Sequence, residues 1–243
     1  MTTQAPSQEA RSLNYVALLE VILLGGTAAL LLSKWLRGLL DYYIHPRYTM
    51  LIVVAAFVLL LMAAVRLRNV LSTNASRRPG GMYLLLALPL LLGVLVPAQP
   101  LGADTLSGRG VDATAGASLA NRQFQMDGDS TRWNLLEWST ALSIGDIDLL
   151  DKPVDVIGFV YHDKQLDADS FYVVRYVITC CSADGAGAGL PVVWENGGAL
   201  PVDSWVRVQG KIGTMQIVGA EQAAIVASTV EPVTQPDNPY LYP

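Results

Sequence analysis

Residues 175–184 read Arg-Tyr-Val-Ile-Thr-Cys-Cys-Ser-Ala-Asp and contain both cysteines of the 243-residue chain. The aromatic and β-branched residues before Cys180 favour a β-strand, and the glycine-rich residues 185–189 favour a turn after it. The stretch therefore predicts a strand that ends at two adjacent cysteines. Because neighbouring side chains of a strand point to opposite faces, we expect one thiol to face the protein interior and the other to face solvent.

The β pattern extends from Pro153 to near the end of the chain. Runs rich in Val, Ile, Phe and Trp alternate with clusters of Gly, Asp and Asn. These runs predict five strands, at 154–161, 171–181, 190–194, 205–212 and 223–230. Helical spacing of apolar residues predicts one short helix at 133–142. Residues 131–243 are therefore expected to form an all-β barrel of the oligonucleotide/oligosaccharide-binding (OB) type, in which Gly210 lets a strand bend. A β-sandwich is the alternative.

The N-terminal region, residues 1–100, contains three apolar runs. They cover residues 14–33, 48–65 and 82–98. A helix that crosses a membrane needs about 20 apolar residues, so the first two runs predict transmembrane helices. The third run is shorter and contains Pro89 and Gly93; we expect it to span as well, and a buried helix of a soluble protein is the alternative. Residues 101–130 are rich in Gly, Ala, Ser and Asp and predict a flexible linker.

Charge is divided unevenly between the two regions. Residues 1–100 carry eight Lys or Arg and three Asp or Glu. Residues 101–243 carry eight Lys or Arg and eighteen Asp or Glu. An acidic domain repels phosphate backbones, which argues against a nucleic-acid partner. Four arginines and no acid lie between the second and third runs, which favours a cytoplasmic position for that loop. Three spans then predict a multi-pass protein of a bacterial inner membrane with an external C-terminal domain.

Four short motifs accompany the apolar runs. They are Gly158-Phe159-Val160-Tyr161, Arg175-x-x-Ile178-x-Cys180-Cys181-x-Ala183-Asp184, Trp205-Val206-x-Val208-x-Gly210 and Pro239-Tyr240-Leu241-Tyr242. Together they resemble the YcgQ-like family of bacterial membrane proteins, whose members are proposed subunits of a two-component permease. The resemblance covers nearly the whole chain. It implies a polytopic permease subunit as partner and implies no catalytic residue.

Cys180, Cys181 and Asp184 form the first candidate ligand site, together with His162 at the end of a predicted strand. Cysteine, histidine and carboxylate ligands would suit a zinc-like divalent metal. A disulfide between neighbours would be strained, because adjacent Cα atoms lie about 3.8 Å apart and ordinary bridges span roughly 4.4–6.8 Å. Three alternatives stay open at this point: a packing role, metal or thiol-ligand binding, and a redox-active vicinal disulfide.

Arg175 lies within the predicted strand that leads to the cysteines. An arginine among apolar residues predicts a partner for its charge. We expect an ion pair with one of the many acidic residues, and the alternative is an anionic ligand held at the same site.

Glu20 is the only acidic residue in the three apolar runs. A carboxylate within a membrane span is costly and marks a functional candidate. Gly25, Gly26 and Ala29 follow it, and small residues let another helix approach closely. The first helix is therefore expected to face the partner subunit, with Glu20 paired across that interface. The alternative is a protonated Glu20 shielded by the helices of its own chain.

The sequence as a whole favours an accessory permease subunit over an enzyme. In this interpretation the external domain binds or gates a substrate, with a metal ion as one candidate, or holds the complex together. The first alternative is a membrane-anchored thiol-disulfide protein that acts through Cys180 and Cys181. A structural assembly factor is the second. A redox enzyme would require a reducible disulfide, which an accessory module does not.

Overall fold

The computed structural model describes residues 14–70, 80–111, 128–144 and 149–243. The chain divides into two compact units. The first consists of residues 1–41 and 46–99, and the second consists of residues 42–45 and 100–243. The short segment Tyr42–His45 therefore belongs to the second unit, although it lies between the first two helices in the sequence.

The first unit consists of α1 (Tyr15–Leu36), α2 (Thr49–Leu67) and α3 (Met82–Leu95). Each helix covers most of the apolar run that predicted it. Two of the described helices, Tyr15–Leu36 and Pro46–Leu67, are long and apolar enough to cross a membrane. At 14 residues, α3 is shorter. It ends three residues before the predicted limit, because Val96 adopts an extended conformation.

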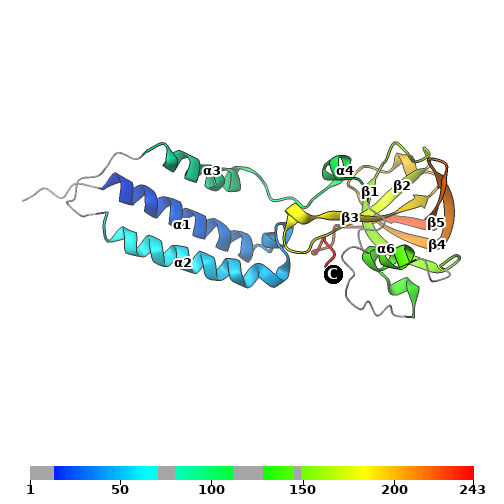
Figure 1. Ribbon diagram of the computed structural model, residues 1–243, viewed down its shortest axis with the longest axis horizontal. Coiled ribbons are helices and arrows are strands. Elements are labelled where there is room, and N and C mark those ends of the chain that lie inside the picture. The colour runs from blue at the N-terminus through cyan, green and yellow to red at the C-terminus, as the bar shows by residue number, and fades with distance from the viewer. Residues whose placement is uncertain (1–13, 71–79, 112–127, 145–148) are drawn as a thin grey trace, which may run out of the picture. The chain divides into compact units, whose positions relative to one another are not determined.

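Helix α1 lies between α2 and α3, as Figure 1 shows. Small residues allow both contacts. A Cβ atom on Gly25 would lie 3.9 Å from the Ala63 Cβ of α2, and one on Gly26 would lie 3.0 Å from Leu90 Cδ2 of α3. In the same contact between α1 and α3, the lack of a side chain at Gly93 of α3 leaves room for Leu30 of α1. Close helix approach through small residues is typical of helix pairs in membranes.

The second unit is built on five strands. They are β1 (Pro153–Tyr161), β2 (Ser170–Val177), β3 (Ala186–Val193), β4 (Trp205–Ile217) and β5 (Ala220–Pro232). They pair in the closed order β1-β2-β3-β5-β4, and β4 pairs with β1. All pairs are antiparallel except β3 with β5. The expected closed barrel is therefore present and the sandwich alternative is not.

The barrel core is filled by alternate strand residues and by one helix. Helix α6 (Leu135–Ile144) packs against β1, β2 and β3, and its Trp138 is fully buried. The sequence predicted that this helix would start and end two residues earlier. The pairing register between β4 and β5 shifts at Gln209 and Gly210. A Cβ atom on Gly210 would lie only 2.2 Å from the Val226 carbonyl oxygen. Gly210 thus allows the bend that the sequence predicted.

Two segments differ from the expected secondary structure. Strand β2 ends at Val177 and not at Cys181, and residues 186–189 belong to β3 and not to a turn. The glycines of β3 serve close packing. A Cβ atom on Gly187 would lie 2.4 Å from Leu106 Cδ2, and one on Gly189 would lie 2.9 Å from the Val173 carbonyl oxygen. Composition alone does not separate this use of glycine from a turn.

The beginning of the expected 101–130 linker is part of the second unit. It contains α4 (Ala103–Arg109), whose Leu106 is fully buried beside Phe159 and Tyr176. The Tyr176 hydroxyl donates a hydrogen bond of 2.9 Å to the Gly102 carbonyl. Residues 112–127 of the expected linker lie outside the described residues.

Candidate functional site

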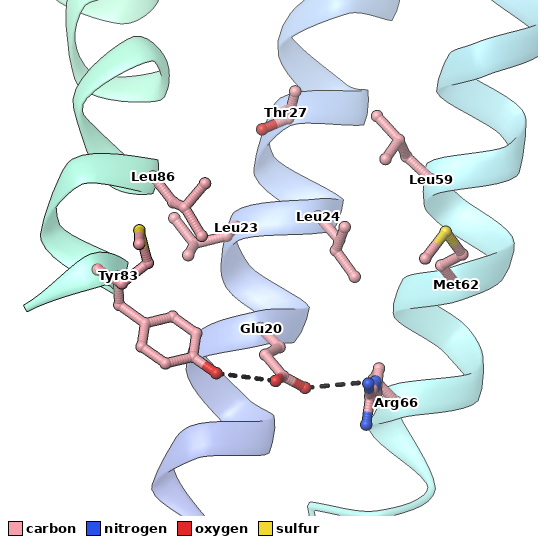
Figure 2. A pocket seen from close by; sticks show the side chains of 10 residues that line it. Glu20, Leu23, Leu24, Thr27, Leu59, Met62, Arg66, Tyr83 and Leu86 are labelled. Carbon is pink, nitrogen blue, oxygen red and sulfur yellow. Dashed lines mark hydrogen bonds and ion pairs between the residues drawn. The ribbon is translucent and has the colours of Figure 1, made fainter. Parts of the chain in front are cut away.

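Glu20 and two partners form a polar cluster in the first unit. The Tyr83 hydroxyl of α3 donates a hydrogen bond of 2.9 Å to Glu20 Oε1. The Arg66 Nε atom of α2 lies 3.3 Å from Glu20 Oε2. Figure 2 shows the carboxylate between these two side chains. The partners of Glu20 therefore lie in its own chain, and the carboxylate needs no residue from another subunit to balance its charge.

The helix order explains why these three residues meet. Glu20 lies in the second turn of α1, Arg66 is the penultimate residue of α2, and Tyr83 is the second residue of α3. Because α1 and α2 run antiparallel beside each other, the start of one lies next to the end of the other. Sequence reasoning missed this pair, although Arg66 is the basic residue in the last turn of α2.

A cleft of about 480 Å³ opens from the polar cluster into the space between the helices. Its other lining residues are almost all apolar, and they come from all three helices. They include Leu23, Leu24, Leu59, Met62 and Leu86. Figure 2 shows these side chains above Glu20 on the facing sides of the helices. The cleft therefore has a polar end and an apolar interior, which suits an amphipathic occupant.

The small residues that predicted a partner-facing helix have different surroundings. Gly25 and Gly26 face α2 and α3 of the same chain, and both are partly buried. Ala29 is exposed. The structure therefore uses the two glycines for internal packing and leaves Ala29 on the surface of α1.

The cysteine segment lies beside residues 42–45 in the second unit. Ile44 and Cys181 form an antiparallel bridge. The His45 N–H donates to the Cys180 carbonyl at 3.0 Å, and the Ser182 N–H donates to the Tyr43 carbonyl at 2.9 Å. Residues 180–182 thus pair with the segment that joins α1 to α2. Nothing in the sequence pattern of residues 42–45 indicates this pairing.

The two thiols lie at the surface of the unit, and neither is in its core. Cys180 is exposed and Cys181 is partly buried, with 3.6 Å between their sulfur atoms and no disulfide. The expected cysteine that faces the protein interior is therefore not observed. The reason is that β2 has already ended, so strand alternation does not apply.

Asp184 organises the turn that carries Cys180. Its carboxylate accepts hydrogen bonds from the backbone N–H of Cys180 at 2.8 Å and of Thr179 at 3.3 Å. Desolvation acts to raise the pKa of Asp184, but hydrogen bonds from the Cys180 side chain and from backbone N–H groups outweigh it and lower the pKa. Asp184 and then Cys181 raise the pKa of the Cys180 thiol from 9.0 to about 11. At neutral pH this thiol is protonated, which disfavours a nucleophilic role.

His162 does not join the cysteines. Its Nε2 atom lies 2.9 Å from the Leu200 carbonyl oxygen, at the end of β1. Within the described part of the chain, no group of three or more His, Cys, Asp or Glu side chains is arranged to hold a metal ion. The structure therefore brings Cys180, Cys181 and Asp184 together without the fourth predicted ligand.

Arg175 holds the C-terminal segment of the chain. Its guanidinium donates to the carbonyl oxygens of Asn238, Pro239 and Tyr240 and lies 5.8 Å from the centre of the Trp205 ring. Burial lowers the pKa of Arg175. The expected acidic partner is thus replaced by carbonyl oxygens, which supply acceptors without adding a charge.

Tyr240 completes this arrangement, and the sequence did not single it out as a site residue. Its ring is almost fully buried. Its hydroxyl accepts from the Leu101 N–H at 2.9 Å and donates to the Tyr42 carbonyl at 3.1 Å. The closing Pro-Tyr-Leu-Tyr motif therefore joins three distant segments of the second unit.

Family models match both regions of the chain. The DUF1980 N-terminal domain matches residues 19–112, and the DUF1980 C-terminal domain matches residues 120–243. No solved structure matches the chain.

Two curated proteins are similar. One, from Streptococcus mutans, is 23% identical over 93% of this chain and 99% of its own length; its name proposes a subunit of a two-component membrane permease complex. The other, the UPF0703 protein YcgQ of Bacillus subtilis, is 22% identical over 39% of this chain and 34% of its own length. Because the C-terminal model alone covers more than half of the residues, this chain belongs to the DUF1980 family.

Proposed function

We propose that this chain is the accessory subunit of a two-component permease in a bacterial inner membrane. A larger, polytopic subunit would form the transport path. The supporting likeness is that to the Streptococcus mutans protein, because a match over 93% of this chain includes both of its units. The structural observation that carries the proposal is the outward apolar face of α2.

This face, here called the outer face of α2, consists of Val54, Phe57, Leu61 and Val65. Their spacing places them on one side of the helix, and each side chain is more than half exposed. Apolar side chains in such a continuous row require lipid or protein against them. In the proposed complex the outer face of α2 contacts the larger subunit.

The pairing of Ile44 with Cys181 supports a topology with three crossings. Residues 42–45 connect α1 to α2 and belong to the second unit. If α1 and α2 cross the membrane, the second unit must lie on the side where α1 ends and α2 begins. The chain leaves that side through α2, so α3 must cross back before residue 100.

The length of α3 is compatible with a crossing. Fourteen helical residues span about 21 Å, against roughly 30 Å for the hydrocarbon core. The apolar residues after Leu95 add length, and a bilayer thins locally around a short span at modest cost. The positive loop after α2 then favours a cytoplasmic position for that loop and an external position for the second unit.

The second unit is proposed as an OB-like external module. Its five-stranded closed barrel has the strand number of that class. In the complex it would capture or gate the substrate or hold the subunits together. Cys180, Cys181 and Asp184 remain a candidate ligand site of this module, with a zinc-like metal ion as the ligand to test.

Site-specific photo-crosslinking tests the subunit contact. A benzophenone amino acid at Leu61 places the reactive group on the outer face of α2, and the same residue at Gln216 of β4 serves as a surface control for non-specific capture. We expect a crosslink from position 61 to one large membrane protein, at a yield well above that from position 216. Equal yields from positions 61 and 216, or no membrane protein captured from position 61, would contradict a subunit contact through α2.

A further inference from the structure

The cleft in the first unit separates its polar and apolar groups along the helix axis. Glu20, Arg66 and Tyr83 lie at one end, at the termini of their helices. Leucine and methionine side chains line the rest, with Thr27 as the one further polar residue. Helix termini with charged side chains lie at headgroup level in a bilayer, so the polar end faces the headgroups and the apolar part faces the hydrocarbon.

The size of the cleft suits a single extended hydrocarbon chain. Its volume of about 480 Å³ extends along α1 from Glu20 to Thr27, which is about 10 Å of helix. The cleft therefore runs along the helices for about two turns, with leucine and methionine side chains against which an acyl chain would pack.

The polar end favours a phosphate group. The Arg66 side chain is 53% exposed while its Nε atom lies beside Glu20. A guanidinium has five N–H donors, and its planar fork matches phosphate oxygens. Arg68 is exposed two residues further along the chain, just after α2 ends, so Arg66 and Arg68 against Glu20 leave a net positive charge at this end. Glu20, held by Tyr83, fixes the orientation of Arg66.

We infer that the cleft between α1, α2 and α3 binds one phospholipid, whose phosphate contacts Arg66 and whose acyl chain lies against Leu24, Leu59 and Leu86. This site is independent of the subunit contact proposed above, because the outer face of α2 lies on a different side of that helix. Free inorganic phosphate shares the headgroup chemistry. It would leave the apolar part of the cleft unfilled.

Native mass spectrometry of the full chain tests the inference. The protein is purified in mild detergent and mixed with phosphatidylglycerol, with a diacylglycerol of the same chains, or with inorganic phosphate. Leu59→Trp fills the cleft, and Leu84→Trp, at an exposed position of α3 outside the lining, is the control. We expect Leu59→Trp to retain at least tenfold less phosphatidylglycerol than the wild type, and Leu84→Trp to retain as much as the wild type.

The headgroup contact has its own measurement. Arg66→Gln is expected to reduce retention of phosphatidylglycerol severalfold and to leave retention of the diacylglycerol unchanged. Leu86→Trp repeats the filling experiment from α3, and melting curves identify any variant that is unfolded. Equal lipid retention by the wild type and the folded filling variants would overturn the proposal, as would equal loss in Leu84→Trp. Binding of inorganic phosphate without lipid retention would also overturn it.

Discussion

Ile44 and Cys181 form an antiparallel bridge, although one lies between the first two helices and the other lies beyond β2. This bridge ties the α1–α2 connection to the barrel unit. It has a topological consequence if α1 and α2 cross the membrane, because a segment only a few residues from both helices then stays on one side. The bridge therefore predicts that residues on either side of this connection and residues of the barrel share a compartment.

Accessibility labelling checks that topology. In a Cys180→Ser, Cys181→Ser background, single cysteines replace Arg47, Asn69 and Ser107. We expect an impermeant thiol reagent to label positions 47 and 107 from outside intact cells and to label position 69 only after lysis. Labelling of 47 and 107 from opposite sides would show that α3 does not cross.

The Glu20–Arg66 pair predicts non-additive effects on stability. Glu20→Leu leaves the guanidinium without its carboxylate, and Arg66→Leu leaves the carboxylate without its cation. Each single change should therefore lower the thermal stability of the full chain in detergent. The double change should cost less than the sum, with a coupling of about 0.5–3 kcal/mol and toward the lower end because Arg66 is half exposed.

Tyr83→Phe supplies the control for this cycle. It removes the hydroxyl that donates to Glu20 and keeps the ring, so its effect should be smaller than that of Arg66→Leu. Strict additivity of the Glu20 and Arg66 changes would mean that the two groups do not interact.

Cys180 should be unreactive at neutral pH and should become reactive when Asp184 loses its charge. The carboxylate is the main cause of the raised pKa of the Cys180 thiol, about 11. In a Cys181→Ser background, Asp184→Asn should therefore increase the rate of alkylation by iodoacetamide at pH 8 by about tenfold or more. An unchanged rate would show that Asp184 does not control this thiol.

Cys180 and Asp184 make the stability of this turn depend on pH in opposite directions. The folded-state pKa of Cys180 is raised, so the stability it contributes is complete below the unfolded value near 9 and is lost as pH rises through about 11. The pKa of Asp184 is lowered, so its contribution is present above the unfolded value and is lost as pH falls through the folded value. Hydrogen exchange at the Cys180 amide, followed in buffers from acid to alkaline pH, should show faster exchange at both limits after correction for intrinsic rates. Protection that is constant with pH would contradict this account.

The sequence predicted the elements of the fold better than it predicted the site. Helical spacing of apolar residues locates α6, a run of β-branched and aromatic residues locates β1, and a long continuous apolar run locates α2, each within a few residues. The sequence pattern does not distinguish a glycine that packs, such as Gly187, from one that turns. It also does not show that Tyr42–His45 would pair with Ser182 and its neighbours, because that contact depends on backbone groups that every residue carries. Glu20 was predicted to pair across a subunit interface, whereas its partners in the structure, Arg66 and Tyr83, come from its own chain and become apparent only from the helix arrangement.

Arg175 predicts a further effect that is local to the C-terminal segment. Arg175→Met keeps an apolar stem and removes three hydrogen bonds to residues 238–240. The amides of Ile178 and Leu241, which bond across this junction, should exchange with solvent markedly faster.

Arg207→Met is the matched control for that experiment. Its guanidinium pairs with Asp155 on β1, in another part of the barrel, so the Ile178 and Leu241 amides should be unaffected. Equal acceleration in both variants would point to a general loss of stability and not to a specific role of Arg175.

The central claim is that this chain works as one subunit of a membrane complex. Affinity purification of the chain, tagged at its natural chromosomal locus and extracted in a lipid-preserving polymer, tests it most directly. The account predicts one larger, polytopic membrane protein in a fixed ratio to the chain, at a yield that falls when bulky tryptophans replace Val54 and Phe57 on α2. Recovery of the chain alone, with no membrane protein in fixed ratio, would contradict it.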